Sequence, residues 1–187
     1  MERIVVLRYA KALFEIALER GAGVLDEYNQ TCKDILALLE GDAEFAAVVN
    51  HLSISADDKM ATMKAIFEGK VADDFMGIFA LIFRRGRQGE LAGILEHFGK
   101  LYKSHKRIAT AKLMSAAPLP QSKIDEIAAM LTKKLEKTVE FNITVDPTLI
   151  AGFRVEVDGY VFDASMKAGL SQLKKQLLSA GRHTVLQ

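Results

Sequence analysis

The residues of this 187-residue chain that could bind a ligand or catalyse a reaction are a glycine-containing run, four histidines and one cysteine. The run from Gly93 to Lys100 approaches a phosphate-binding loop, which needs four residues between its glycines and a strand before it. Here five residues separate the glycines, Leu101 replaces the hydroxyl that would hold Mg²⁺, and the run lies inside a helical pattern. We therefore predict an amphipathic helix there and no nucleotide site.

The histidines do not pair with cysteine or carboxylate at the spacing that zinc ligands show. They are His51, His97, His105 and His183. Cys32 falls on the apolar stripe of a helix, which favours an inert core thiol over a nucleophile. A single cysteine forms no internal disulfide, and this indicates a reducing compartment. We expect no catalytic residue, no metal site and no cofactor, and we expect that the chain is not an enzyme.

One stretch, 84–107, carries a charge imbalance in a chain whose net charge is only +1. It holds seven lysines and arginines against two acids. Such clusters contact phosphate, so an RNA-binding helical-bundle protein is the alternative function. Tyr102 is the one aromatic nearby that could stack a base, which weakens that case. Two other interpretations of this stretch are possible: a docking surface for an acidic partner, or an ordinary solvated helix and turn. We expect no nucleic-acid partner.

Residues 1–106 read as six consecutive amphipathic helices with brief turns, which predicts an all-α six-helix bundle. The first helix, from Ile4 to about Arg20, has two apolar stripes, although a surface helix of a small bundle needs only one. The second stripe consists of Val5, Tyr9, Ala12 and Ile16. The fifth helix, about 72–84, is apolar nearly all round. The surplus apolar surface on these two helices indicates deep burial or a partner helix.

The hydrophobic period changes from helical to alternating near residue 107, and the domain boundary is placed there. Residues 107–187 are expected to form a small α/β domain with the element order β-α-β-β-β-α. The first two strands are predicted at 107–116 and 139–145, with a helix between them.

The most specific local pattern is a β-hairpin that runs into the last helix. The strand 153–157 alternates apolar and charged residues, and Asp158-Gly159 tolerates the positive φ of a tight two-residue turn. The return strand is 160–163, and Ser165 is expected to cap the helix that follows. The apolar positions of that helix are Met166, Leu170, Leu173 and Leu177.

Six fragments that occur in order along the chain carry a family resemblance. They are RYAKALFEIA (8–17), NHLSISADDK (50–59), FRRGRQGELAGILEHF (83–98), TAKLMSAAPLP (110–120), VDPTLIAGFRVEVDGYVFDAS (145–165) and KAGLSQLKKQL (167–177). Together they resemble the δ subunit of bacterial F-type ATP synthases, the counterpart of the mitochondrial oligomycin-sensitivity-conferring protein. The resemblance covers essentially the whole chain. Two departures are Ala151, where a second glycine is usual before Gly152, and Gly169, where arginine is commoner.

The resemblance implies a non-catalytic stator connector that links the α3β3 catalytic head to the b-subunit peripheral stalk and so couples proton-driven rotation to ATP synthesis. It implies one copy per complex at the cytoplasmic face of the bacterial inner membrane. Membrane contact is expected only through the complex, since no apolar run reaches about 18 residues and the start of the chain lacks a signal peptide.

The resemblance also implies where the partners bind. The bundle, 1–106, would receive the amino-terminal helix of an α subunit in a groove between its first and fifth helices. The residues implied in its walls are Tyr9, Ala12 and Ile16 on the first helix and Phe75, Ile78, Phe79 and Ile82 on the fifth. The carboxy-terminal domain would meet the b subunits, and Tyr160 beside the hairpin tip is the candidate contact.

Overall fold

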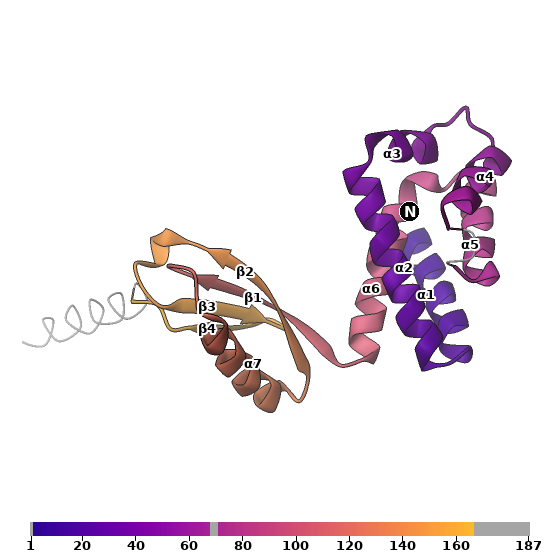
Figure 1. Ribbon diagram of the computed structural model, residues 1–187. Helices are drawn as coiled ribbons and strands as arrows, with labels where there is room; N and C mark the ends of the chain where they lie inside the picture. Colours follow the sequence, from indigo (N-terminus) through magenta and orange to yellow (C-terminus); the bar gives the residue numbers. More distant parts are fainter. Residues whose placement is uncertain (1, 68–70, 167–187) are drawn as a thin grey trace, which may run out of the picture. The chain divides into compact units, whose positions relative to one another are not determined.

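The computed structural model describes residues 2–67 and 71–166 and divides the chain into two compact units, Met1–His105 and Lys106–Gln187. The first unit is helical in its described part, and the second combines a four-stranded sheet with a helix (Figure 1). The expected helical amino-terminal region and α/β carboxy-terminal region are confirmed.

The helical unit contains six α-helices in its described residues. They are α1 (Glu2–Glu19), α2 (Ala22–Gly41), α3 (Ala43–Asn50), α4 (Ala56–Phe67), α5 (Asp73–Arg84) and α6 (Leu91–His105), with a short 3₁₀ helix, η1 (Gln88–Glu90), before α6. Helix α1 packs along α6, α2 and α5, and α4 packs on α5.

Side-chain caps fix where two of these helices begin. The Asp42 carboxylate accepts hydrogen bonds from the backbone N–H groups of Glu44 and Phe45 at 2.9 and 3.0 Å, which satisfies donors that the first turn of α3 leaves free. Before α4, the Ser55 hydroxyl accepts from the Asp58 N–H at 3.1 Å and donates to the Asp58 carboxylate at 2.7 Å. The carboxylate therefore orients the capping hydroxyl.

A row of aromatic rings sets the inward face of α5. The ring of Tyr28 on α2 meets Phe75 edge-on with centroids 4.9 Å apart, Phe75 meets Phe79 at 5.2 Å, and Phe79 meets Phe83 at 6.2 Å. These separations lie in the favourable range for aromatic pairs. The four rings are 5% exposed or less, so the rotation of α5 about its axis is fixed by the core.

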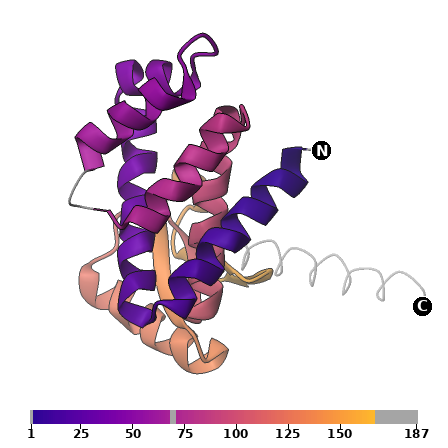
Figure 2. The ribbon, with the colours of Figure 1, turned by 90° about the vertical axis from the view of Figure 1, so that its right-hand side faces the viewer.

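Helices α1 and α5 lie side by side and run antiparallel (Figure 2). The inward stripe of α1 is closed, since Ala10, Leu13 and Ala17 are at most 2% exposed. At the carboxy-terminal end of α1, the Arg20 guanidinium forms an ion pair with the carboxylate of Asp74 in the first turn of α5. This contact joins the two helices at one end.

The α/β unit is built on one mixed sheet. Its elements are β1 (Ile108–Ser115), α7 (Gln121–Leu135), β2 (Thr138–Val145), a 3₁₀ turn η2 (Pro147–Leu149), β3 (Phe153–Val157) and β4 (Tyr160–Asp163). The strand order is β2-β1-β3-β4, with β1 and β2 parallel and the other pairs antiparallel. A parallel pair needs a crossover, and α7 supplies it. One sheet face and α7 share a core whose fully buried members include Ala111, Leu113, Leu131 and Val155.

The predicted hairpin is confirmed. Val157 pairs with Tyr160, which leaves Asp158 and Gly159 as a two-residue turn with φ of 48° and 80°, and two positive φ values define the type I′ turn. The Lys137 ammonium contacts the Asp158 carboxylate at 2.7 Å. This ion pair attaches the hairpin tip to the turn between α7 and β2.

At the end of β4, Asp163 is hydrogen-bonded to Ser165. The Asp163 carboxylate accepts from the Ser165 hydroxyl at 2.6 Å and from its N–H at 3.0 Å, and these two hydrogen bonds lower the pKa of Asp163. The predicted last helix, apart from Met166, lies outside the described residues.

The turn before β3 has an unusual backbone. Ile150 has φ 68° and ψ −56°, and the Ala151 N–H donates to the Leu149 carbonyl at 2.8 Å, which makes a γ-turn of the rare positive-φ type. Gly152 follows with φ 87°, and a Cβ there would lie 2.3 Å from the Ala164 carbonyl oxygen. Ala151 itself has no positive φ, so alanine is accommodated where the family resemblance led us to expect glycine.

Candidate functional site

The chemically suggestive residues do not form a reactive site in the described residues. The run Gly93 to Lys100 lies within α6, where its backbone N–H groups are used by the helix and cannot surround a phosphate. Cys32 is 2% exposed, and burial raises the pKa of its thiol. No cluster of three histidine, cysteine or carboxylate side chains that could hold a metal occurs in ranges 2–67 and 71–166.

The helical unit has a groove of about 830 Å³ between α1 and α5. Its lining residues are Ile4, Val5, Arg8, Tyr9 and Ala12 of α1, Leu81 of α5, and Arg85 and Arg87 just beyond α5. Hereafter we call this the α1–α5 groove. The α1 residues span about 12 Å along the helix axis at 1.5 Å per residue, which is the length of roughly two helical turns.

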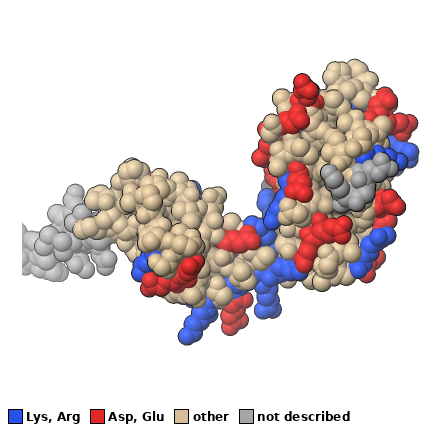
Figure 3. Space-filling view, in the orientation of Figure 1, with Lys and Arg blue, Asp and Glu red and all other residues tan. Residues whose placement is uncertain are grey.

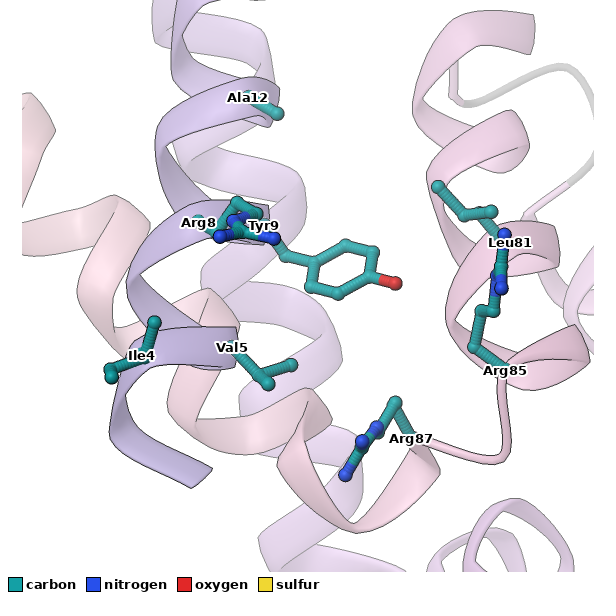
Figure 4. A pocket seen from close by; sticks show the side chains of 8 residues that line it. All are labelled: Ile4, Val5, Arg8, Tyr9, Ala12, Leu81, Arg85 and Arg87. Atoms are coloured by element: carbon teal, nitrogen blue, oxygen red, sulfur yellow. The ribbon is translucent and has the colours of Figure 1, made fainter. Parts of the chain in front are cut away.

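Side chains from both helices reach into the α1–α5 groove (Figure 4). Tyr9 extends its ring from α1 across the gap, and Val5 lies one turn before it. Leu81 points back from α5 and is 45% exposed. The apolar part of the groove is therefore open to solvent, and a partner that covered it would remove apolar surface from water.

Four of the seven residues proposed for the groove walls are accessible, and two of these line it. Tyr9 and Ala12 are lining residues, with Ala12 exposed and Tyr9 partly exposed. Ile16 and Ile78 are partly exposed and lie on α1 and α5 outside the lining set. The structure thus leaves the second stripe of α1 only partly covered, since Val5, Tyr9 and Ile16 are half-buried and Ala12 is exposed.

The other three proposed wall residues require a correction. Phe75, Phe79 and Ile82 are 0%, 2% and 1% exposed and pack in the core of the helical unit. The reason is the aromatic row that begins at Tyr28, which turns this side of α5 inward. They support the groove from behind and do not line it.

The residues on the outward face of α5 do follow a helical spacing that is visible in the sequence. Asp74, Ile78, Leu81 and Arg85 follow one another at intervals of four, three and four residues, the spacing of one helix face. The charged residues at both ends of this series mark it as solvent-facing. Apolarity all round α5 hid this signal, since it left no polar face by which to orient the helix.

The basic stretch 84–107 does not form one continuous surface. Three of its arginines, Arg84, Arg85 and Arg87, lie before η1, and Arg107 belongs to the other unit. Lys103 lies twelve residues into α6, roughly 18 Å along the axis at 1.5 Å per residue. Lys103 and Lys106 also have interaction partners. Both acidic and basic side chains occur on the visible face of the helical unit (Figure 3). This arrangement gives no support to the RNA-binding alternative.

The candidate contact in the α/β unit is at the hairpin tip. Tyr160 opens β4 and is 62% exposed, and the adjacent Val161 is 52% exposed. A hollow of about 350 Å³ beside the tip includes both residues together with polar side chains of β1 such as Lys112. An exposed aromatic next to a rigid turn is suited to contact another protein.

None of the helices in the described ranges combines the length and apolar character needed to cross a bilayer.

Comparison with known proteins gives a consistent result over nearly the whole chain. The family model described as "ATP synthase delta (OSCP) subunit" matches residues 5–177.

Individual relatives share the same description. The proteins named ATP synthase subunit delta from Clostridium kluyveri and Caulobacter vibrioides are each 31% identical to this chain, over 91% and 92% of it and over 93% and 94% of their own lengths. The one from Symbiobacterium thermophilum is 29% identical over 99% of this chain and 98% of its own. Among solved structures, a chain of the Toxoplasma gondii mitochondrial ATP synthase hexamer has the same fold, with a TM-score of 0.68, 22% identity, and coverage of 92% of this chain and 97% of that one.

Proposed function

This chain belongs to the ATP synthase delta (OSCP) subunit family, and we propose that it links the α3β3 head to the b subunits through its two units. As a member of the family it is a structural, non-catalytic stator component of the peripheral stalk of an F-type ATP synthase. The α1–α5 groove would receive the amino-terminal helix of an α subunit, and the α/β unit would meet the b subunits. The observation that carries the first contact is the open apolar groove on the helical unit.

The finer architecture is part of this proposal. Helices α1–α6 act as one six-helix bundle, and a last helix completes the β-α-β-β-β-α order of the α/β domain. One copy serves each complex at the cytoplasmic face of the inner membrane, and the protein reaches the membrane only through its partners.

An apolar groove between two helices suits a helical partner. A bound amphipathic helix places residues at positions i, i+3, i+4 and i+7 into such a groove, and Tyr9 offers an aromatic anchor of the kind that dominates interface energies. A stator must stay attached while the rotor turns, which calls for slow dissociation. Nanomolar affinity corresponds to about −12 kcal/mol and is reached by interfaces of roughly 1,600 Å².

The first test uses the full chain and a synthetic peptide of the amino-terminal helix of the α subunit from the same complex. Calorimetric titration is expected to show binding, and Ala12→Asp is expected to weaken it at least tenfold, since the carboxylate would lose its hydration against apolar walls. Ala37→Asp is the matched control, because Ala37 is an exposed position on α2 that does not line the groove.

Two outcomes would contradict this part of the proposal. Absence of binding by the unaltered chain at micromolar peptide would exclude the groove as an α-subunit site. Equal affinity of the Ala12→Asp and Ala37→Asp variants would place the site elsewhere on the protein.

The second test concerns the α/β unit. Co-purification with a b-subunit carboxy-terminal fragment is expected to fall when Tyr160 is replaced by alanine and to persist for Met130→Ala. Met130 on α7 is 60% exposed, close to the 62% of Tyr160, so the pair is matched in accessibility. Equal retention of both variants would remove Tyr160 from the contact.

A further inference from the structure

Three of the eight side chains that line the α1–α5 groove are arginines, and none of the described lining residues is acidic. Arg8 lies on α1, Arg85 caps the carboxy-terminal end of α5, and Arg87 precedes η1. No ion pair joins any of the three to a carboxylate among the residues that the structure describes. The groove therefore offers three guanidinium groups to whatever occupies it.

Two of these arginines lie at one end of the groove, while Arg8 lies beside Tyr9 midway along the α1 wall (Figure 4). Arg85 and Arg87 stand at the mouth near the carboxy-terminal end of α5 (Figure 4). At the opposite end of α5 the first turn carries Asp73 and Asp74, and the second of these is already paired with Arg20. The two ends thus differ in the sign of their side-chain charge.

The helix dipoles of the walls do not offset this polarity. Each helix carries roughly half a positive charge at its amino terminus and half a negative charge at its carboxy terminus. Because α1 and α5 are antiparallel (Figure 2), the positive end of one lies beside the negative end of the other. The two contributions largely cancel, and the arginines decide the sign.

We propose that the α1–α5 groove selects an amphipathic helix that carries carboxylate side chains at the end lying against Arg85 and Arg87. This inference rests on the proposed docking of a partner helix in the same groove. The apolar stripe of the partner covers Val5, Tyr9 and Leu81, and its carboxylates pair with the guanidinium groups, which suit carboxylates through two parallel N–H donors.

A phosphate-bearing partner such as RNA is less well matched by the same site. Five of the eight lining side chains are apolar or aromatic, whereas single-stranded nucleic acid needs several stacking rings along a basic track. Tyr9 is the one ring among the lining residues. The geometry thus favours a helix with an apolar face and a charged end.

The test measures binding of two synthetic peptides to the full chain by fluorescence anisotropy. One peptide is the amino-terminal helix of the α subunit from the same complex, and the other has every Glu and Asp of that helix changed to Gln or Asn. The proteins are the unaltered chain, the double variant Arg85→Gln/Arg87→Gln, and Arg84→Gln. Arg84 is the matched control, since it is an exposed arginine next in sequence that does not line the groove.

The unaltered chain is expected to bind the acidic peptide about three- to tenfold more tightly than the amide peptide, the range for two or three partly exposed ion pairs. The double variant is expected to bind both peptides equally, and Arg84→Gln to behave as the unaltered chain. The preference should shrink between 50 and 500 mM salt, with most of the change in the association rate.

The outcomes separate this inference from the function on which it rests. Equal binding of both peptides to the unaltered chain, with no effect of the double variant, overturns the carboxylate selection and leaves the helix docking intact. Absence of binding by either peptide overturns both. Displacement of the acidic peptide by a single-stranded RNA oligonucleotide at micromolar concentration would assign the arginines to phosphate and also overturn the inference.

Discussion

Replacing Gly152 by alanine tests how the turn before β3 holds the α/β unit together. Gly152 has φ 87°, and Gly159 in the hairpin has φ 80°, so alanine at either position adopts a disfavoured backbone conformation. That conformation costs an L-residue about 1–2 kcal/mol. The two sites differ in space, since a Cβ at Gly159 meets nothing within 4 Å, whereas one at Gly152 lies 2.3 Å from the Ala164 oxygen.

The close approach adds a second cost at Gly152 alone. Relief of the overlap requires the Ala164 carbonyl to move by roughly 0.7 Å, since real Cβ contacts stay beyond 3.0 Å. Two hydrogen bonds depend on this region, from the Ala164 N–H to the Phe153 carbonyl at 2.9 Å and from the Ala116 N–H to the Gly152 carbonyl at 3.1 Å. Each contributes about 0.5–1.5 kcal/mol. Gly152→Ala should therefore lower the free energy of unfolding by about 2–5 kcal/mol, against about 1–2 kcal/mol for Gly159→Ala.

Urea unfolding followed by peptide-resolved hydrogen exchange measures this difference for each unit separately. A loss of about 2–5 kcal/mol is a large part of the 5–15 kcal/mol typical of a whole domain. Peptides from the α/β unit should lose protection in Gly152→Ala, while peptides from α1–α6 should not change. Equal destabilisation by the two substitutions would show that the contact with Ala164 has no energetic consequence and would refute the reasoning.

Three further predictions follow from single features of the structure. Ile150→Gly should raise the free energy of unfolding by about 1 kcal/mol by relieving positive-φ strain, whereas Ile150→Ala should give no gain in the same urea titration. The folded state keeps the Cys32 thiol protonated above its ordinary pKa, so the unfolded chain loses that proton first. Stability should consequently fall as pH rises through about 9, at a rate approaching 1.4 kcal/mol per pH unit, and Cys32→Ala should lack this component in unfolding titrations at pH 8, 9 and 10. A double-mutant cycle of Arg20→Ala and Asp74→Ala should give a coupling energy of about 0.2–1 kcal/mol that decreases in 1 M salt; a coupling unaffected by salt would contradict the assignment of a solvent-exposed ion pair.

Local patterns predicted the elements of the fold well. Asp158-Gly159 anticipated the hairpin turn together with its positive φ values, and the alternating patterns at 153–157 and 160–163 anticipated β3 and β4. These features depend on near neighbours in the chain, because turn type and strand alternation follow from the φ and ψ that consecutive residues can adopt. The sequence also indicated surplus apolar surface on two helices.

The groove walls were predicted less completely, because they depend on contacts between helices and not on near neighbours in the chain. On α1 the sequence showed a second apolar stripe beside the one that a small bundle needs, and Tyr9 and Ala12 of that stripe do line the groove. On α5 apolar residues occur on every side, so the inward face depends on where Tyr28 of another helix places its ring. Phe75 and Phe79 are consequently core residues.

The sequence by itself determined that the chain forms helices followed by a small α/β unit, that Asp158-Gly159 closes a hairpin, and that the first helix has more apolar surface than it can bury. These properties follow from backbone preferences and hydrophobic period within single elements. Only the tertiary structure decided which side of α5 faces solvent and brought Arg8, Arg85 and Arg87 to one groove. Both depend on contacts between residues far apart in the chain, whose packing no local pattern encodes.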